Sequence, residues 1–566
     1  MTQRKKRLSG AQILIETLIE QGVTDVFGYP GGTVLDIYDA LFRAKRQLRH
    51  ILTAHEQGAA HAADGYARST GKVGVVIATS GPGATNLVTG IATAMLDSVP
   101  MVAITGNVAT SMIGRDSFQE VDITGVTVPI TKHNFFVTDV RTLADTVREA
   151  FQIAREGRPG PVLIDIPKDV QQALCTFTPA KEQPSAQEES FDDAALDEAA
   201  ALIAKAQKPY LYIGGGALGC ELGKQIVALA EKIDAVIGCS FMGLTAVPTD
   251  EPRFLGMQGM HGRFASTAAS RQADLILGVG VRFSDRATGS LERIKTRPTV
   301  IQLDVDLAEL GKNVPLDLGI QGDLRALFPR LCARAKPAKH PDWMRQVQRL
   351  REKESADLLA ADSAQESGLS PRKIFEIINA STDNTTVFAT DVGQHQMWTA
   401  QFAAFRTPHT LVSSGGLGTM GYGLGAAIGA CIGTGAKTVL LTGDGSFGMN
   451  LTELATAVTE KLPLVIVLFN NRTLGMVHQL QHLFYKKRFA GTDLSARRTD
   501  FVKLADAFGA KGTRVETPAQ FETAFKAAMQ SKTPALIEVL IDPETPVLPM
   551  LPQDESIDNI ITTMTE

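Results

Sequence analysis

The sequence of 566 residues has no run of about 18 apolar residues, so no segment is expected to cross a membrane as a helix. Neither sign of charge dominates, since the net charge is -5, and this balance argues against nucleic acid as the main partner. The basic opening "MTQRKKR" has no apolar segment after it, which argues against a secretory signal and favours a solvated tail.

Cysteine is scarce, and the five residues are scattered without CxxC spacing: Cys175, Cys220, Cys239, Cys332 and Cys431. Such a pattern excludes a disulfide framework or a cysteine metal site. We expect these side chains to be buried small apolar groups in a reducing compartment.

The chain is too long for a single hydrophobic core, so about two to four domains are expected. Short apolar strands alternate with helical stretches, which predicts parallel sheets covered by helices on both faces. The expected fold class is α/β, with three doubly wound parallel-sheet domains at residues 8–175, 194–335 and 369–550. A Pro-, Ser- and Glu-rich linker (176–193), a connector with a charged helix (336–368) and a tail (551–566) complete the chain.

The two outer domains resemble each other. "ATSGPGATNLVTGIATA" in the first and "VSSGGLGTMGYGLGAAIGA" in the third both combine a strand, a glycine turn and a small-residue helix. The sequence therefore predicts two related outer domains flanking a different middle domain.

The segment "GDGSFGMN…VIVLFNN" places polar residues after two neighbouring strands. Asp444 follows one strand and Asn471 the next, and in a parallel sheet both strand ends lie at the carboxyl edge, where ligands bind. A carboxylate, an amide oxygen and the backbone carbonyl of Thr473 suit Mg²⁺ held jointly with a diphosphate. Gly443 and Gly445 let the backbone approach the phosphates, and the region of Ser446 supplies N–H donors. The alternative is an Asp-Gly turn beside an Asn-rich strand end.

The segment "LTAHEQGAAHAADGYAR" (52–68) combines a carboxylate, Glu56, with six alanines. Its helix face has almost no side-chain bulk, so we expect another group to lie close to this backbone. In the middle domain, Gly214, Gly216 and Gly219 have GxGxxG spacing between a strand and a helix. The next strand ends without an acidic residue, which leaves both a dinucleotide site and a plain tight turn open.

Several motifs together resemble the catalytic subunits of acetohydroxyacid synthases, which are thiamine-diphosphate enzymes. They are "YPGG", "HEQGAAHAADGYAR", "TSGPGATN", "FQEVD", "GRPGPVLIDIPKDVQ", "GMHG", "DVGQHQMWTAQ" and "GDGSFGMN…NN". The similarity runs from about residue 8 to residue 552, nearly the whole chain.

The resemblance implies a role for Glu56. In this family the aminopyrimidine ring of the cofactor lies against the start of the small-residue helix, and a glutamate hydrogen-bonds its N1′. A dry, apolar site favours the protonated carboxyl group. Sharing that proton favours the imino form of the ring, which then deprotonates C2 of the thiazolium. Alternatively, Glu56 is a carboxylate that only interacts with the helix dipole.

The resemblance also implies that two regions from different subunits bind the cofactor. Besides the residues above, the matching positions are Pro82, Asn86, Val392, Gly393, Gln394, His395, Gly418 and Met420. Met420 would support the bent cofactor, although a core methionine is the alternative. His395 alone would more often be a structural histidine.

For the middle domain the resemblance implies FAD, which has no net redox task in the reaction and is structural. The matching residues are Arg158, Gly214, Gly215, Gly216, Met260, His261, Gly262, Gly280, Arg282, Asp285, Arg286, Asp304, Val305 and Asp323. Ser284 departs from the usual acidic pair before Arg286, which puts part of this set in doubt.

Substrate residues follow from the same resemblance. Arg286 matches the guanidinium that binds the carboxylate of the second 2-oxo acid by two-point hydrogen bonding. Phe118, Gln119 and Lys168 match residues of the substrate channel, and Gly32 leaves room above the thiazolium. Leu480 stands where most members carry a tryptophan that favours 2-oxobutyrate; alternatively it is a core leucine packed with Val477 and Phe484.

The expected function is decarboxylation of pyruvate on thiamine diphosphate with Mg²⁺ and FAD. The resulting hydroxyethyl carbanion adds to a second pyruvate, giving 2-acetolactate, or to 2-oxobutyrate, giving 2-aceto-2-hydroxybutyrate. The family pattern implies cytoplasmic branched-chain amino-acid biosynthesis. It also implies a homo-oligomer with active sites at subunit interfaces and a small regulatory subunit. The alternatives are a flavin-free catabolic acetolactate synthase or a pyruvate oxidase of the same fold, and a non-catalytic homologue.

Overall fold

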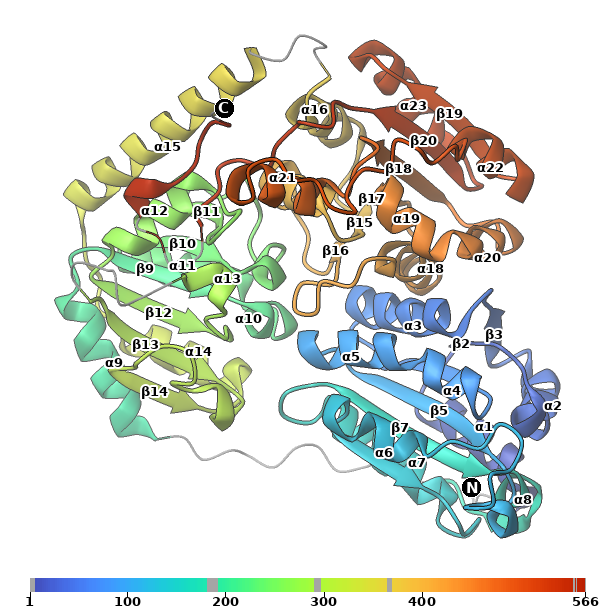
Figure 1. The fold of residues 1–566 in the computed structure, drawn as a ribbon. Coiled ribbons are helices and arrows are strands. Elements are labelled where there is room, and N and C mark those ends of the chain that lie inside the picture. The colour runs from blue at the N-terminus through green and yellow to red at the C-terminus, as the bar shows by residue number, and fades with distance from the viewer. Residues whose placement is uncertain are drawn as a thin grey trace.

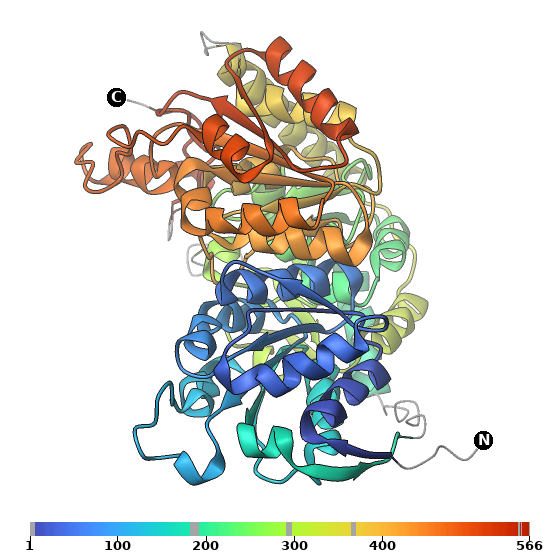
Figure 2. The same cartoon turned by 90° about the vertical axis from the view of Figure 1, so that its right-hand side faces the viewer.

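The computed structural model describes residues 6–180, 192–289, 297–363, 369–552, 555 and 557–564. Three α/β domains follow one another along the chain, and each has a six-stranded parallel sheet between helices (Figure 1). The expected fold class is confirmed. The view turned by 90° shows the N-terminal domain below the C-terminal one (Figure 2). No helix among the described residues is long and apolar enough to cross a membrane.

The two outer sheets share one topology. The N-terminal sheet has the order β3-β2-β4-β5-β7-β6 and the C-terminal sheet has the order β16-β15-β17-β18-β20-β19. Numbered along the chain, the strands of both sheets run 2-1-3-4-6-5, which supports the inference that these domains are related. The strands are β2 (Asp25–Gly28), β3 (Arg49–Leu52), β4 (Gly74–Ala78), β5 (Met101–Asn107), β6 (His133–Phe136), β7 (Pro161–Pro167), β15 (Val387–Thr390), β16 (Leu411–Val412), β17 (Thr438–Gly443), β18 (Leu464–Asn470), β19 (Lys511–Val515) and β20 (Ala535–Leu540).

The middle sheet is different, with the order β11-β10-β9-β12-β13-β14. Along the chain this order is 3-2-1-4-5-6, the arrangement found in dinucleotide-binding domains. Its strands are β9 (Pro209–Ile213), β10 (Val236–Cys239), β11 (Phe254–Met257), β12 (Leu275–Val279), β13 (Thr299–Asp304) and β14 (Leu318–Gln321). A separate antiparallel pair joins β1 (Lys6–Ser9) to β8 (Leu174–Phe177).

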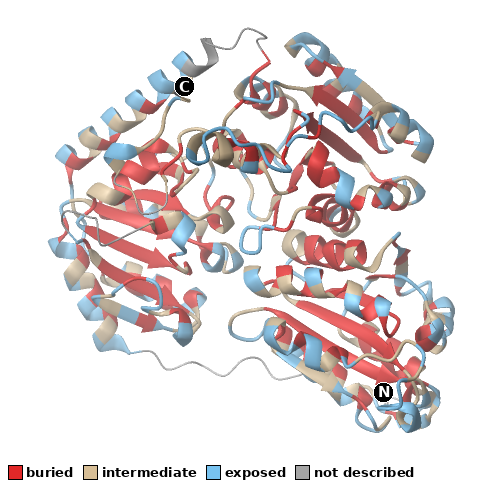
Figure 3. Cartoon of the chain, viewed as in Figure 1, coloured by how far each residue is buried: buried red, intermediate tan, exposed pale blue. Residues whose placement is uncertain are grey.

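Helices cover both faces of each sheet, and the strands between them are buried (Figure 3). The N-terminal domain has α1 (Gly10–Glu20), α2 (Leu35–Ala44), α3 (Glu56–Thr70), α4 (Pro82–Asn86), α5 (Val88–Asp97), α6 (Ile123–Thr127), α7 (Leu143–Arg155) and α8 (Lys168–Gln172). The middle domain has α9 (Asp193–Lys205), α10 (Gly215–Gly219), α11 (Gly223–Lys232), α12 (Phe264–Gln272), α13 (Asp285–Thr288) and α14 (Leu324–Arg334). The C-terminal domain has α16 (Pro371–Ser381), α17 (Gln394–Phe402), α18 (Tyr422–Thr434), α19 (Asp444–Asn450), η7 (Leu451–Glu453), α20 (Leu454–Thr459), α21 (Gly475–Phe484), α22 (Phe501–Phe508) and α23 (Pro518–Gln530).

The small residues of α3 pack against α18 of the same chain. A Cβ atom on Gly65 would lie 2.1 Å from the carbonyl oxygen of Ala426, and one on Gly429 would lie 1.8 Å from that of Ala62. Only residues without bulk allow the two backbones to come this close. Most of the alanine- and glycine-rich face is therefore needed for the contact between the outer domains, and only the start of α3 is left to face a cofactor.

The segments between the domains differ in what the structure describes. Much of the expected linker, residues 181–191, lies outside the described residues. The charged helix of the connector is α15 (Pro341–Ser363), and it packs against the middle domain through the buried Trp343 and an ion pair between Glu354 and Arg263. All five cysteines are free, but only Cys239 and Cys431 are buried, so the expectation for the other three is not met.

Candidate active site

The expected magnesium ligands lie where β17 and β18 end. Asp444 begins α19 directly after β17, and Asn471 follows β18 directly. Asp444, Asn471 and Thr473 are all buried, and the backbone N–H of Thr473 donates to Asn471 Oδ1 at 3.2 Å. Burial raises the pKa of Asp444 to about 6, while backbone hydrogen bonds, including one from Gly445, act in the opposite direction. A buried carboxylate of this kind is stabilised in its ionised form by a cation.

Gln394 and His395, at the start of α17, lie beside these ligands. Gln394 Oε1 accepts a hydrogen bond from Asn471 Nδ2 at 3.1 Å. A Cβ atom on Gly443 would lie 3.1 Å from His395 Nδ1, so the glycine makes room for the ring. Burial lowers the pKa of His395 to about 3, so the imidazole is neutral at neutral pH. Both residues thus lie beside the expected magnesium ligands, and their contact with the diphosphate stays a prediction.

Met420 and the loop before α18 lie close to the start of α19, which contains Asp444 and Gly445. A Cβ atom on Gly445 would lie 3.9 Å from Met420 Cε, and Met420 is half-buried, unlike a core methionine. Gly418 has a φ of 68° and is exposed. The hydroxyl group of Ser446 donates to the carbonyl oxygen of Val392 at 2.8 Å and thereby ties α19 to the segment that contains Gly393.

Two buried polar atoms of this region have no hydrogen-bond partner among the described residues: His395 Nε2 and Thr473 Oγ1. They lie in the same region as the buried Asp444. The three oxygen ligands are also the kind that Mg²⁺ prefers. These residues therefore fit a magnesium ion with a polar group such as a diphosphate. The described residues contain no cluster of three or more His, Cys, Asp or Glu side chains able to hold a metal ion, so the protein ligands would be few.

Glu56 lies at the start of α3 and is half-buried in the single chain. Its Oε2 accepts a hydrogen bond from Asn86 Nδ2 at 2.9 Å, and a Cβ atom on Gly83 would lie 3.3 Å from its Oε1. Pro82 is the exposed first residue of the same short helix, α4. The structure thus brings Glu56, Pro82 and Asn86 together. Among the described residues, however, no hydrogen bond joins Glu56 to the C-terminal group.

The expected substrate residues of the N-terminal domain lie at the carboxyl edge of its sheet. Lys168 Nζ lies 3.4 Å from the carbonyl oxygen of the exposed Gly32. Gln119 adopts a left-handed backbone with a φ of 60° and packs against Gly81 of the glycine turn. Phe118 is 86% exposed, so its ring has no cover in the single chain.

The glycines of the middle domain are needed for packing. A Cβ atom on Gly214 would lie 2.2 Å from the carbonyl oxygen of Gly280, and one on Gly216 would lie 2.8 Å from Gly280 Cα. The close approach of β9 and β12 thus explains Gly214 and Gly216, two of the three glycines of the GxGxxG spacing, without a ligand. Gly215 and Gly219 are not constrained in this way by backbone.

Other expected flavin residues are spread along the carboxyl edge of the middle sheet. Burial raises the pKa of Asp304 and lowers that of His261 to about 4. The buried atoms His261 Nδ1 and Gln258 Oε1 have no partner among the described residues, which leaves polar atoms for a ligand. The remaining positions of the set lie on the loops that follow β11, β12 and β13 and at the starts of α13 and α14: Met260, Gly262, Arg282, Asp285, Val305 and Asp323.

Two arginines of the expected set have other partners. Arg158 hydrogen-bonds Ser98 and forms an ion pair of 2.8 Å with Glu309, and so joins the N-terminal and middle domains. Arg286 is 66% exposed and contacts Met260 Sδ at 3.4 Å. Its guanidinium group is therefore accessible.

Leu480 lies on α21 and is half-buried. Its helical neighbours Val477 and Phe484 are 47% and 50% exposed. The three side chains do not form a buried core, so the alternative of a plain core leucine is not supported.

Sequence reasoning missed two buried carboxylates that hold the outer domains together. Asp97 accepts hydrogen bonds from the N–H groups of Gly415 and Gly416, in the loop that leads to Met420, and pairs with Arg68 at 2.9 Å. Glu453 accepts hydrogen bonds from the N–H groups that precede Glu56. An acidic residue within the apolar helical stretch around Glu453 was the signal that could have revealed it.

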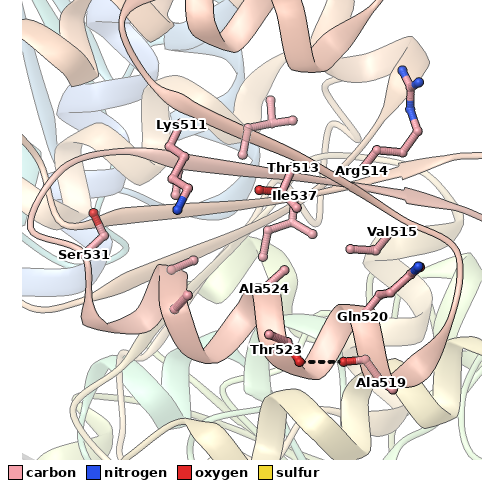
Figure 4. A pocket seen from close by; sticks show the side chains of 14 residues that line it. Lys511, Thr513, Arg514, Val515, Ala519, Gln520, Thr523, Ala524, Ser531 and Ile537 are labelled. Carbon is pink, nitrogen blue, oxygen red and sulfur yellow. Dashed lines mark hydrogen bonds between the residues drawn. The ribbon is translucent and has the colours of Figure 1, made fainter.

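A surface groove between α23 and the edge strand β19 lies away from all of these residues (Figure 4). Alanines line its floor, and Lys511 and Arg514 lie at its rim. Arg514 is already paired with Glu538 at 2.8 Å. The groove shares no residue with the candidate site.

Comparison with known proteins agrees with this geometry. Models of the thiamine pyrophosphate enzyme N-terminal, central and C-terminal domains match residues 8–126, 196–331 and 391–539. The acetolactate synthase of Mycobacterium bovis is 44% identical, over 98% of this chain and 91% of its own length. The acetolactate synthase isozyme 2 large subunit of Escherichia coli is 44% identical, over 97% of this chain and 98% of its own length. The acetolactate synthase of Arthrospira platensis is 41% identical, over 97% of both chains.

These matches cover the strand ends that contain Asp444 and Asn471 and the helix that begins at Glu56. With its three parallel-sheet domains, the chain belongs to the acetolactate synthase large subunits, which are carboligases dependent on thiamine pyrophosphate.

Proposed function

We propose that this carboligase converts two molecules of pyruvate into 2-acetolactate and CO₂, and that it also accepts 2-oxobutyrate as the second substrate to form 2-aceto-2-hydroxybutyrate. The observation that carries the proposal is the pair of separate sites, Glu56 with Asn86 and Asp444 with Asn471, in a chain with full-length similarity to acetolactate synthases. This reaction is the first common step of branched-chain amino-acid biosynthesis, and we place it in the cytoplasm.

Bound thiamine diphosphate supplies the carbanion chemistry that amino-acid side chains lack. Glu56 holds and moves a proton at N1′ of its aminopyrimidine ring, and Asn86 orients that carboxyl group through the 2.9 Å hydrogen bond. Asp444, Asn471 and the carbonyl group of Thr473 would hold Mg²⁺, which would neutralise charge on the diphosphate. Met420 supports the cofactor next to Gly445.

The second 2-oxo acid brings a carboxylate, and the exposed guanidinium group of Arg286 is suited to bind it with two hydrogen bonds. Lys168 and Gly32 lie in contact at one edge of the N-terminal sheet, and Gln119 lies beside the glycine turn. These residues, with Phe118, form the channel by which substrates enter.

A second copy of the chain completes the site. Phe118 is 86% exposed and Met449, on α19, is 55% exposed, and apolar side chains this accessible near a site favour a covering partner. Glu56 of one chain and Asp444 of the other then face the same cofactor. We also propose a small regulatory subunit, as the family pattern implies.

FAD fits the middle domain through its strand order and the unpartnered atoms of His261 and Gln258, and it has a structural role. The test is incubation of purified protein with pyruvate, thiamine diphosphate and Mg²⁺, with and without FAD, and without an electron acceptor. Formation of acetolactate supports the proposal. Turnover only with an electron acceptor would indicate a pyruvate oxidase, and no turnover under any condition would indicate a non-catalytic homologue.

A further inference from the structure

The carboxylate of Glu453 lies against the start of α3, although the two belong to different outer domains. Its Oε1 accepts hydrogen bonds from the N–H groups of Ala54 at 3.1 Å and His55 at 3.0 Å. Its Oε2 accepts one from the hydroxyl group of Thr456 at 2.7 Å. The side chain is fully buried. The buried carboxylate thus accepts two backbone N–H groups from a segment whose own residues are exposed or only partly buried.

The surroundings of Glu453 are shaped for this contact. A Cβ atom on Gly58, in the first turn of α3, would lie 2.1 Å from Glu453 Oε1. The absence of a side chain there lets the carboxylate lie over the helix start, where the helix dipole favours a negative charge. Among the described residues no lysine or arginine pairs with Glu453, and N–H and O–H donors bind its two oxygens.

The bound N–H groups belong to the two residues directly before Glu56. We propose that Glu453 is a positioning residue, which fixes the backbone at the start of α3 so that the Glu56 carboxyl group reaches the cofactor. This inference rests on the proposed role of Glu56. Asn86 orients the Glu56 side chain, and Glu453 sets the backbone from which that side chain starts.

The position of Glu453 in the chain adds a second consequence. It ends η7, which follows α19 directly, and α19 begins at Asp444. The segment 444–453 thus begins with a magnesium ligand, Asp444, and ends with Glu453, the residue that binds the start of α3. If each site combines two chains, this segment links the magnesium ligand of one site to the glutamate of the other.

The first test uses Glu453→Gln in the full-length protein without cofactor. The amide offers one acceptor oxygen in place of two, so hydrogen–deuterium exchange of the amides of residues 54 and 55 should become at least about tenfold faster. Asp234→Asn is the matched control, because Asp234 is also a buried carboxylate that accepts a backbone N–H, from His340 in another part of the fold. Unchanged exchange at residues 54 and 55 in Glu453→Gln would overturn the proposal.

The second test measures the rate at which C2 of bound thiamine diphosphate exchanges its proton with solvent, at saturating cofactor. Misplacement of Glu56 by about 1 Å should slow this exchange roughly 10- to 100-fold in Glu453→Gln. In a Glu56→Gln background the same change should have no further effect, because the residue acts through Glu56. Equal losses in both backgrounds would show a general structural role and refute the inference.

Two further outcomes separate this inference from the proposed function. If Glu56→Gln itself leaves C2 exchange unchanged, the role of Glu56 is wrong and the inference falls with it. If Glu56→Gln slows exchange and Glu453→Gln does not, only the inference is wrong. Should Glu453→Gln fail to fold, Glu453→Asp keeps the charge with a shorter reach, and an intermediate loss of C2 exchange is expected; no loss there would contradict the proposal.

Discussion

At the scale of single residues, two carboxylates with different surroundings have different proposed roles, metal binding and proton transfer. Asp444 is buried beside Asn471, as expected of a metal ligand, whereas Glu56 is half-buried and reachable. Asn86 keeps one oxygen of Glu56 occupied, which leaves the other to face a ligand. The position of each group is therefore consistent with the role that the sequence predicted for it.

Replacing Glu56 by glutamine keeps the shape of the side chain but removes the proton that it shares with N1′. Turnover of pyruvate should fall by about 10²–10⁴-fold, the usual contribution of acid–base catalysis. Binding of thiamine diphosphate, measured by titration, should be retained, because Asp444 and Asn471 are untouched. Near-normal turnover in Glu56→Gln would rule out this role for the residue.

Leu480 is expected to give a weak preference between the two acceptors. They differ by one methylene group, whose packing against a large ring is worth about 1–3 kcal/mol, or roughly 10- to 200-fold in selectivity. Leucine covers that group less well, so a mixture of pyruvate and 2-oxobutyrate should give products within a few-fold of the substrate ratio. Leu480→Trp should shift the ratio toward acetohydroxybutyrate. A wild-type preference of about fifty-fold or more for 2-oxobutyrate would contradict this assignment.

At the scale of helices and strands, the crossing of α3 and α18 is the contact least tolerant of change. Gly429→Ala places a Cβ atom against the carbonyl oxygen of Ala62, and overpacking of this kind costs about 1–3 kcal/mol. Gly448→Ala, on α19, is the matched control, since a Cβ atom on this helical glycine meets nothing within 4 Å. Thermal unfolding should show a lower midpoint for the first variant and not for the second. Equal midpoints would show that the crossing can relax.

The sequence predicted central strands better than edge strands. The strands predicted before Asp444 and Asn471 are β17 and β18, and they were recognisable because strands buried on both faces are continuous apolar runs. The edge strands β6 (HNFF) and β19 (KGTRV) contain more polar residues, so no continuous apolar run marks them. In β20 the apolar run is interrupted by Glu538, a buried residue paired with Arg514 and Asn470, and no local pattern reveals such a tertiary pair.

In the candidate site, too, local motifs could be predicted from the sequence, whereas contacts between distant segments could not. Motifs that lie within one strand–helix unit, such as Asp444 with Gly443 and Gly445, were found because the spacing is local. Asp97 and Glu453 act on segments more than 300 residues away in the chain, so their partners depend on how α3 meets α18. Similarly, the glycine spacing of the middle domain left a ligand site and a tight turn open, and the structure explains Gly214 and Gly216 by their packing against Gly280.

At the scale of the whole molecule, the middle domain is expected to bind FAD that stabilises the folded site. The protein should purify yellow or regain a flavin spectrum on titration, and its activity should follow flavin occupancy. A difference in thermal midpoint between the loaded and stripped protein gives a second measure of the same binding. A stripped protein that is fully active and binds no FAD at micromolar concentrations would favour the flavin-free alternative.

The central claim is that Glu56 of one chain and Asp444 of another serve one thiamine-diphosphate site that forms acetolactate. The most direct measurement is acetolactate formation by a complex co-expressed from two inactive variants, Glu56→Gln and Asp444→Ala, with different affinity tags. In a symmetric dimer, random pairing leaves about a quarter of the sites with both wild-type residues. The account predicts about half of wild-type specific activity in the doubly tagged complex, where one of the two sites is intact, and none in the singly tagged complexes. No recovery in a doubly tagged complex that forms normally would contradict it.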